Sequence, residues 1–306
     1  MLWMAWRQHR LAVFSVAVAF SGAAAFFFLL GNRMRAALPA DVLPNCFSVA
    51  SGPECDGWAR VVNETLNLSV LLPVLAIAAG VFLGAPLLAR EMEQRTHRYA
   101  WTQGVSRLRW LNTKLVMLGA TVLLLSTAVS AAHMWWYAPA AKTEGLFDAF
   151  GMTAPVFPAV CLFAFLLGVF MGALFKRVLT AITLTTAGFL ACLVPVQTIF
   201  RTRYLPAVDG QYAEARGGWV MDFLYTDGSG TYTLFSALQK AGLSGSGTSF
   251  GSKEIGQLKA LGFREFVSYQ PADRFWTFQL IEAGIFTGLA AVCVALTFYL
   301  VRTRLA

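Results

Sequence analysis

Two ionisable side chains lie within long apolar runs of this sequence. Glu282 is in the run at 276–301, and His133 is in the run at 115–138. Ionisable groups at membrane depth often serve proton relays, ion paths or substrate contacts. Their separate runs predict two different helices, across which the side chains could pair. For Glu282, only six residues into its run, the alternatives are a carboxylate that is protonated or reaches the membrane surface, and one facing a water-filled vestibule.

The motifs that would let the chain drive chemistry by itself are missing. It has no G-x-x-x-x-G-K-[ST] phosphate loop and no H-E-x-x-H metal motif. His9, His97 and His133 lie in separate segments, so no Cys/His cluster has metal-ligand spacing. We therefore expect no catalysis, cofactor or metal in this chain. Nucleotide-driven work would have to come from a partner.

The composition is that of a membrane protein. The 306 residues are 57% hydrophobic and 13% charged, whereas soluble domains are about 45–50% apolar and about 25% charged. The excess lies in runs of about 20 residues, the length that crosses a bilayer. The first run lacks a cleavage site typical of signal peptides, so it is counted as a span. We predict an all-α polytopic membrane protein with six transmembrane helices, at residues 11–30, 69–89, 115–138, 154–175, 178–200 and 276–301.

Charge predicts how these spans are oriented. With six spans, both termini lie on one side, which carries twelve basic and two acidic residues. The opposite side carries twelve basic and thirteen acidic residues, and Glu282 is inside a span. Basic residues are retained in cytoplasmic loops, so we expect both termini in the cytoplasm. The net charge of +8 is then a topology signal, and no nucleic-acid partner is expected.

The segment at 201–275 is predicted to lie outside the cytoplasm, between spans five and six. It contains a strand-like piece (TYTLFSAL), a helix-like piece (KEIGQLKALGF) and a Gly/Ser tract at 242–252. About 75 residues suffice for a small folded cap but not for a large independent core. In another outer loop, Cys46 and Cys55 flank a Gly-Pro pair, and an oxidising compartment favours a disulfide between them. The alternative is two free thiols.

Small residues recur every four positions in three spans, which permits close approach of helices. Such faces serve either packing within the bundle or an interface between subunits. They consist of Ala76, Gly80 and Gly84 in the second span, Ala164, Gly168 and Gly172 in the fourth, and Gly284 and Gly288 in the sixth.

A polar stretch, EMEQRTHRYAWTQGVSR at 91–107, separates the second and third spans. Glu91 and Arg95 have the spacing of a stabilising helical pair. Gly104 is a helix terminator, and Ser106 can cap the third span. We predict a short amphipathic cytoplasmic helix at 90–106, connected tightly to two spans. The alternative is an ordinary basic loop that only sets topology.

This stretch resembles the membrane subunits of type-2 ABC exporters, in the version seen in actinobacteria. The pattern E-x-E-Q-R-T-x-R-x-x-W-T-Q-G-x-S-R-x-R-W carries the resemblance, together with WRQHR at 6–10 and YQPADRFWTFQLIEAGIF at 269–286. In that family two membrane subunits pair with two ATP-hydrolysing subunits. The long segment at 201–275 departs from shorter members of the family.

The resemblance also implies roles for individual residues. The helix at 90–106 would dock in a groove of the ATPase through Glu91, Glu93, Arg95, Thr96, Arg98, Tyr99 and Trp101. Residues 1–10 would form an interfacial helix along the inner leaflet, with side chains suited to that place: Trp3, Trp6, Arg7 and Arg10.

These expectations together describe a permease subunit of an ATP-driven exporter in a bacterial plasma membrane. It would contact lipid, pair with a second permease copy, expected to be identical, and use two ATPase copies that bind ATP and Mg²⁺. The substrate would be an amphipathic or hydrophobic drug, antibiotic, peptide or lipid. The alternatives are a polytopic membrane enzyme or anchor subunit, and an ATPase-linked signalling module that does not transport.

Overall fold

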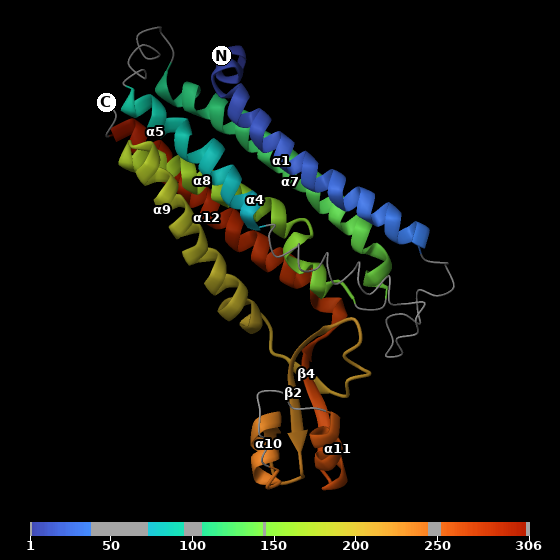
Figure 1. Ribbon diagram of the computed structural model, residues 1–306. Helices are drawn as coiled ribbons and strands as arrows, with labels where there is room; N and C mark the ends of the chain where they lie inside the picture. Colours follow the sequence, from blue (N-terminus) through green and yellow to red (C-terminus); the bar gives the residue numbers. More distant parts are fainter. Residues whose placement is uncertain (1, 38–72, 95–105, 143–144, 244–251, 304–306) are drawn as a thin grey trace.

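A computed structural model describes residues 2–37, 73–94, 106–142, 145–243 and 252–303. It consists of a long helix bundle with a small lobe at one end (Figure 1). Six helical segments among the described residues are long and apolar enough to cross a membrane, as the sequence predicts. They are His9–Ala36, Pro73–Glu93, Leu108–Ala141, Phe147–Phe175, Val178–Arg203 and Ala272–Thr303.

Several of these helices extend beyond the predicted spans. Helix α1 runs without interruption over Leu2–Ala37, and α7 covers Arg107–Ala141. Residues 2–10 of the predicted interfacial helix form the first turns of α1, which continues without interruption into the span. Ser106 caps α7 as predicted, its side chain accepting a hydrogen bond from the Arg109 N–H at 3.4 Å.

The second span consists of two α-helical pieces with a π-helical stretch between them. Helix α4 (Pro73–Ala78) is followed by a π-helical stretch, η1 (Ala79–Gly84), and by α5 (Ala85–Glu93). Residues 69–72 of the predicted span lie outside the described residues. The 3-10 helix η2 (Phe147–Met152) leads into α8 (Val156–Phe175), which ends at a left-handed Lys176.

The fifth and sixth spans lead into and out of the lobe. Helix α9 (Val178–Pro195) continues as π-helix η3 (Val196–Phe200) and 3-10 helix η4 (Arg201–Arg203). The sixth span is α12 (Phe275–Thr303), preceded by η5 (Ala272–Arg274). Figure 1 shows the N and C ends of the chain at the end of the bundle opposite to the lobe.

Helix α8 is the centre of the bundle, with most of its side chains buried. It packs against α12, α5, η1, α7 and α9, while α1 packs along α7. The glycine faces of the second and fourth spans meet here. A Cβ on Gly168 would lie 2.4 Å from the Gly80 carbonyl oxygen, and one on Gly84 would lie 2.2 Å from the Phe165 carbonyl oxygen. These two faces therefore serve packing within the bundle.

The lobe, which we call the sheet lobe (204–271 without 244–251), corrects the all-α assignment. It holds a four-stranded antiparallel sheet in the order β1-β4-β2-β3. The strands are β1 (Val208–Gly210), β2 (Trp219–Thr226), β3 (Thr231–Thr233) and β4 (Arg264–Gln270). The two long strands are far apart in the sequence, so their pairing leaves little local signal.

Two short helices complete the sheet lobe, α10 (Leu234–Lys240) and α11 (Ser252–Ala260). Together with β2 they bury a small apolar core around Tyr225 and Leu238. The helix-like piece KEIGQLKALGF is helical as far as Ala260, and its last three residues lie beyond the helix. In the strand-like piece TYTLFSAL only the first three residues form a strand, because Thr233 caps a helix there and accepts a hydrogen bond from the Ser236 N–H.

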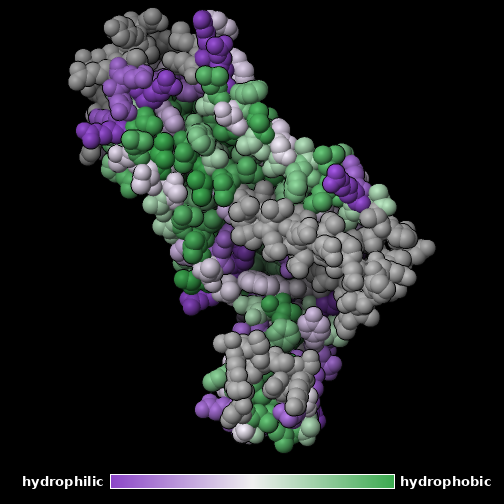
Figure 2. Space-filling model, viewed as in Figure 1, coloured by the Kyte–Doolittle hydropathy of each residue, from purple (hydrophilic) through white to green (hydrophobic). Residues whose placement is uncertain are grey.

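The surface of the bundle is suited to lipid. Figure 2 shows hydrophobic residues along its length and hydrophilic residues gathered toward its ends. Large apolar side chains such as Leu11, Leu124 and Leu179 are exposed there. In water such a surface would be costly, whereas in a bilayer it has its normal environment. The chain is therefore a multi-pass membrane protein.

Candidate functional site

A polar cluster joins α5 and α7 at the end of the bundle that carries the termini. Lys114 of α7 is ion-paired with Glu91 of α5, and its side chain is only 2% exposed. The ammonium group also lies 4.3 Å from the centre of the Trp110 ring, a favourable cation–π arrangement. The pair fixes the last turn of α5 to the second turn of α7.

The same end of α5 contacts α9. Glu93 accepts a hydrogen bond from the Val178 N–H at 3.2 Å, at the start of α9. A carboxylate is favourable there because the free N–H groups of a helix N-terminus carry partial positive charge. Both glutamates of the predicted docking set therefore bind neighbouring helices, so an additional contact with a partner stays a prediction.

The other predicted docking residues lie outside the described residues: Arg95, Thr96, Arg98, Tyr99 and Trp101. The structure does place the two ends of their segment. Gln94 follows the last turn of α5, and Ser106 caps α7. Any force on the intervening residues therefore reaches two helices that the Glu91–Lys114 pair already joins.

The predicted interfacial residues occupy the first turns of α1. The side chains of Trp3, Trp6, Arg7 and Arg10 are exposed, and the Arg7 guanidinium lies 5.4 Å from the centre of the Trp3 ring. Exposed Trp and Arg suit the boundary between lipid and water. Their placement at a membrane surface stays a prediction.

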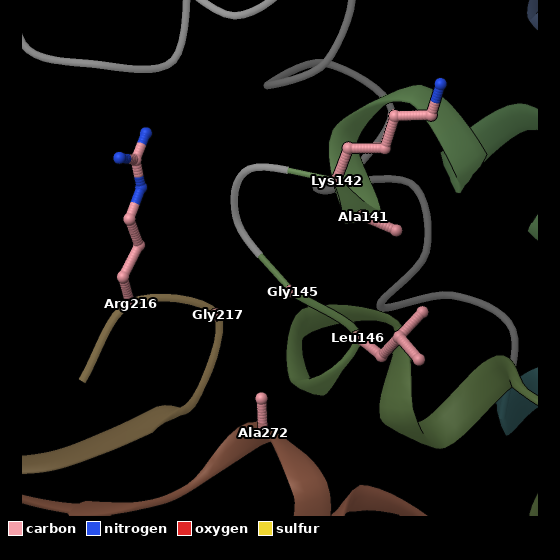
Figure 3. A pocket seen from close by; sticks show the side chains of 7 residues that line it. All are labelled: Ala141, Lys142, Gly145, Leu146, Arg216, Gly217 and Ala272. Carbon is pink, nitrogen blue, oxygen red and sulfur yellow. The ribbon is translucent and has the colours of Figure 1, made fainter. Parts of the chain in front are cut away.

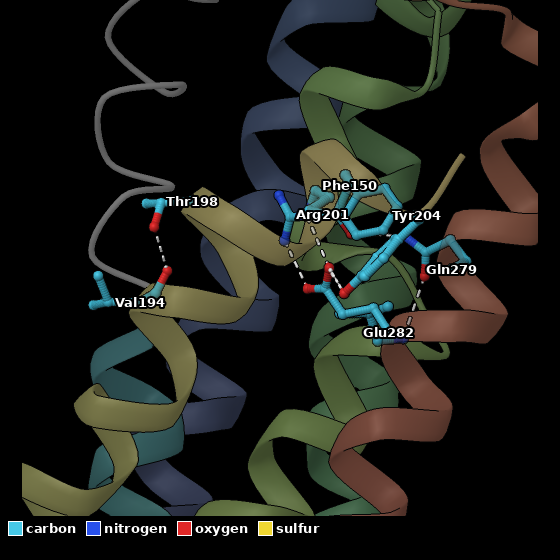
Figure 4. Close-up of polar contacts among 8 residues, drawn as sticks. Phe150, Val194, Thr198, Arg201, Tyr204, Gln279 and Glu282 are labelled. Carbon is cyan, nitrogen blue, oxygen red and sulfur yellow. Dashed lines mark hydrogen bonds and ion pairs between the residues drawn. The ribbon is translucent and has the colours of Figure 1, made fainter. Parts of the chain in front are cut away.

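A second polar cluster lies at the opposite end, where the sheet lobe joins the bundle. Arg201 donates two hydrogen bonds to Glu282 of α12, from Nε at 2.8 Å and from Nη2 at 2.6 Å. Glu282 is fully buried, and Figure 4 shows Arg201 and Tyr204 facing its carboxylate. Among the interpretations of Glu282, the structure thus shows a buried ion pair.

Two further contacts surround this ion pair. The Tyr204 hydroxyl donates to Glu282 at 3.4 Å, and burial together with the carboxylate raises the pKa of Tyr204, so its phenol stays protonated. The Arg201 guanidinium also lies 4.3 Å from the centre of the Phe150 ring in η2. The cluster therefore joins the end of the fifth span, the start of the sixth and the residues before α8.

Gln279, one turn before Glu282, extends this connection. Its amide donates to the Phe150 carbonyl at 2.7 Å and accepts from the Val156 N–H at 3.3 Å. Sequence reasoning missed both Gln279 and Arg201. A signal was present for the arginine, since it directly follows one span while an uncompensated glutamate lies in the next.

His133 lies in an aromatic cluster. Its ring is 5.0 Å from that of Phe27 on α1 and 5.4 Å from that of Trp136, between centres. Its Nδ1 has no hydrogen-bond partner among the described residues. Because the Glu282 carboxylate is bound by Arg201, the two intramembrane residues are not brought together as a pair.

The cysteines divide into two groups. Cys46 and Cys55 lie outside the described residues, so their disulfide stays a prediction. Cys161, Cys192 and Cys293 are free thiols in helices. In the part of the chain that the structure describes, no group of three or more His, Cys, Asp or Glu side chains could hold a metal ion.

The comparison with protein families identifies the bundle. Residues 16–201 match the model of a family described as ABC-2 membrane transporter related. The match begins within the first span and ends near the end of the fifth, at the arginine that pairs with Glu282. No curated protein and no solved structure matches the chain significantly. With well over half of its residues matched, the chain belongs to the ABC-2 membrane transporter related family and is an ABC transporter permease.

Proposed function

We propose that this permease is the membrane subunit of an ATP-driven exporter. Two copies would pair with two copies of a separate ATPase, which binds ATP and Mg²⁺, and would form the path for an amphipathic or hydrophobic substrate. The family match supports the permease assignment, and the family implies an ABC ATPase partner. The missing phosphate loop of this chain agrees with that division of work.

The proposed orientation places the termini in the cytoplasm of a bacterial cell and the sheet lobe outside the plasma membrane. The charge asymmetry of the sequence supports it. The bundle supports placing these segments on one side of the membrane. Both chain ends, the end of α5 and the junction of α8 with α9 all lie at the end opposite to the sheet lobe (Figure 1).

The observation that carries the coupling mechanism is the Glu91–Lys114 ion pair. It joins α5 and α7 beside the segment 95–105 that would contact the ATPase. The pair is buried, so breaking it leaves a charge in a poorly hydrated place. A displacement of the segment would therefore move both helices together, and packed helices shift between discrete arrangements.

The test uses the intact complex. The tagged permease is purified from its native membranes, and the co-purifying ATPase is identified by mass spectrometry. Inside-out vesicles then report ATP-dependent uptake of ethidium, an amphipathic dye. Replacing the phosphate-loop lysine of the ATPase should abolish uptake while the complex still assembles. Lys114→Gln should lower dye uptake per ATP hydrolysed, whereas the exposed-site variant Arg203→Gln should not.

Two results would contradict the proposal. Uptake that continues with the inactive ATPase and follows an imposed proton gradient would indicate an ion-coupled carrier. If the permease purifies without any ATPase, under conditions that preserve other membrane complexes, the proposed ATPase partner would be contradicted.

A further inference from the structure

A cavity of about 410 Å³ lies between the bundle and the sheet lobe. Small-ligand sites in proteins generally measure about 300–1,000 Å³. Its lining comes from three parts of the chain that are distant in the sequence: Ala141, Lys142, Gly145, Leu146, Arg216, Gly217 and Ala272.

The cavity lies at the level where helices leave the membrane. Ala141 is the last residue of the third candidate span, Ala272 is the first residue of the sixth, and Leu146 directly precedes the fourth. Three span ends thus meet at one place, and the turn with Arg216 and Gly217 reaches it from the sheet lobe. A bilayer around this bundle would bring its headgroups to the same level.

The lining combines two cations with an apolar base. Lys142 and Arg216 are exposed, and Figure 3 shows them on opposite sides of the cavity, both extending away from Ala272. Ala272 lies below them, and Ala141 and Leu146 lie on the same side as Lys142. None of the described residues that line the cavity is acidic. Neither cation makes a hydrogen bond or ion pair within the described parts of the chain.

The chain backbone brings the two sides together closely. A Cβ on Gly145 would lie 1.9 Å from the Gly217 carbonyl oxygen, so a side chain at 145 would push the turn of the sheet lobe away. Both glycines have positive φ, at 83° and 76°, which favours glycine. The distance between the two cation-bearing segments is therefore fixed by backbone contact.

We propose that this cavity binds the phosphate group of an anionic phospholipid from the adjacent leaflet. Two cations at the rim match a phosphate, which arginine and lysine both bind well. The apolar base suits the first carbons below the headgroup. A soluble phosphate compound shares the recognised chemistry, but it would not use the apolar base or the position at the span ends. The site is independent of the ATPase proposal.

The test measures lipid retention. The full-length permease is placed in nanodiscs with phosphatidylglycerol and phosphatidylcholine, released into detergent, and examined by native mass spectrometry. Wild type should keep a phosphatidylglycerol molecule in preference to phosphatidylcholine. At about fivefold in affinity per surface cation, the double variant Lys142→Gln/Arg216→Gln should bind it on the order of thirtyfold more weakly. The charge-preserving double variant Lys142→Arg/Arg216→Lys should keep most of the binding.

Matched variants separate this site from general surface charge. Arg203→Gln removes an exposed cation at the same end of the bundle, outside the cavity, and should retain the lipid. Glu144, outside the described residues, lies two positions from Lys142, and Glu144→Gln should retain the lipid at least as well as wild type. Both cavity cations are exposed, so an unchanged thermal unfolding temperature should show that the double variant folds.

The outcomes decide the proposal. Equal retention of phosphatidylglycerol by wild type and the Lys142/Arg216 double variant would overturn it, as would lipid loss in Arg203→Gln or Glu144→Gln. If inorganic phosphate displaces the lipid at a concentration equal to that of the lipid, the cavity binds soluble phosphates, and the proposal of a phospholipid ligand is wrong.

Discussion

The buried charges of this permease act in pairs, and each pair joins helices. The Lys114–Glu91 pair joins two helices at the end of the bundle that carries the chain termini. The Arg201–Glu282 pair joins the two helices that lead into and out of the sheet lobe. A lone charge inside a membrane is costly, so the partner explains how each is tolerated. The glutamate that stands out in the sequence as an ionisable residue within a span is in the structure the acceptor of two arginine hydrogen bonds.

This arrangement predicts the effect of removing one charge. Glu282→Gln would leave the Arg201 guanidinium, 16% exposed, without its counter-charge, at a cost of about 3–5 kcal/mol. The apparent unfolding temperature in detergent, followed by tryptophan fluorescence, should fall. The double variant Arg201→Gln/Glu282→Gln should recover part of the loss, because no charge is then left unpaired. Arg203→Gln, at an exposed arginine nearby, should change stability by about 0.5 kcal/mol or less.

A double variant that is no more stable than Glu282→Gln would contradict this account. It would mean that hydrogen bonding to Tyr204 or packing, and not charge pairing, makes Glu282 important. Ethidium uptake should fall less in Glu282→Gln than with the inactive ATPase, since the pair stabilises the bundle and does not supply energy.

The close packing of the second span on α8 depends on glycines, which have no side chain. Gly168 approaches the backbone of η1 so closely that even a methyl group collides with a carbonyl oxygen. Gly284 on α12 has the same four-residue spacing to its neighbour, but a Cβ at this position would meet no atom of the described residues within 4 Å. The spacing alone cannot distinguish these two environments.

Two alanine substitutions therefore have opposite expected effects. Gly168→Ala should destabilise the protein by about 1–3 kcal/mol, because overpacking forces the helices apart. Gly284→Ala should be neutral or stabilise by up to about 1 kcal/mol, since alanine is the better helix former. Thermal unfolding of the two variants in the same detergent gives the comparison. Equal destabilisation by both would indicate that Gly284 faces a partner subunit.

The sequence predicts those features of the helices and strands that depend on residues close together in the chain. Hydropathy gives the six spans, and local signals give the break at Lys176 and the cap at Ser106. The pairing of β2 with β4 and the bond of Arg201 to Glu282 join residues that are remote in the sequence. No local pattern encodes the strand pairing, so the sheet had to come from the structure. For the ion pair, the sequence places an arginine directly after one span and a glutamate in the next, but the bond between them is shown by the structure.

The bundle has two ends with different chemistry, separated by an apolar body. One end collects the chain termini, the Glu91–Lys114 pair and the connection to 95–105. The other carries the sheet lobe, the Arg201–Glu282 pair and the cavity with its two cations. The family match runs over residues 16–201, so the sheet lobe and α12 both lie beyond the matched region.

The proposed orientation of these ends can be tested by labelling single cysteines in whole cells. In a variant without the five native cysteines, a cysteine at Gln257 on α11 should react with a membrane-impermeant maleimide. One at Gln94, after α5, should react only once the cells are opened. Both positions are exposed, so a difference between them reports the side of the membrane and not burial. Labelling at Gln94 but not at Gln257 in intact cells would invert the orientation. The sheet lobe would then face the ATPase side, and coupling through the ends of α5 and α7 would be impossible.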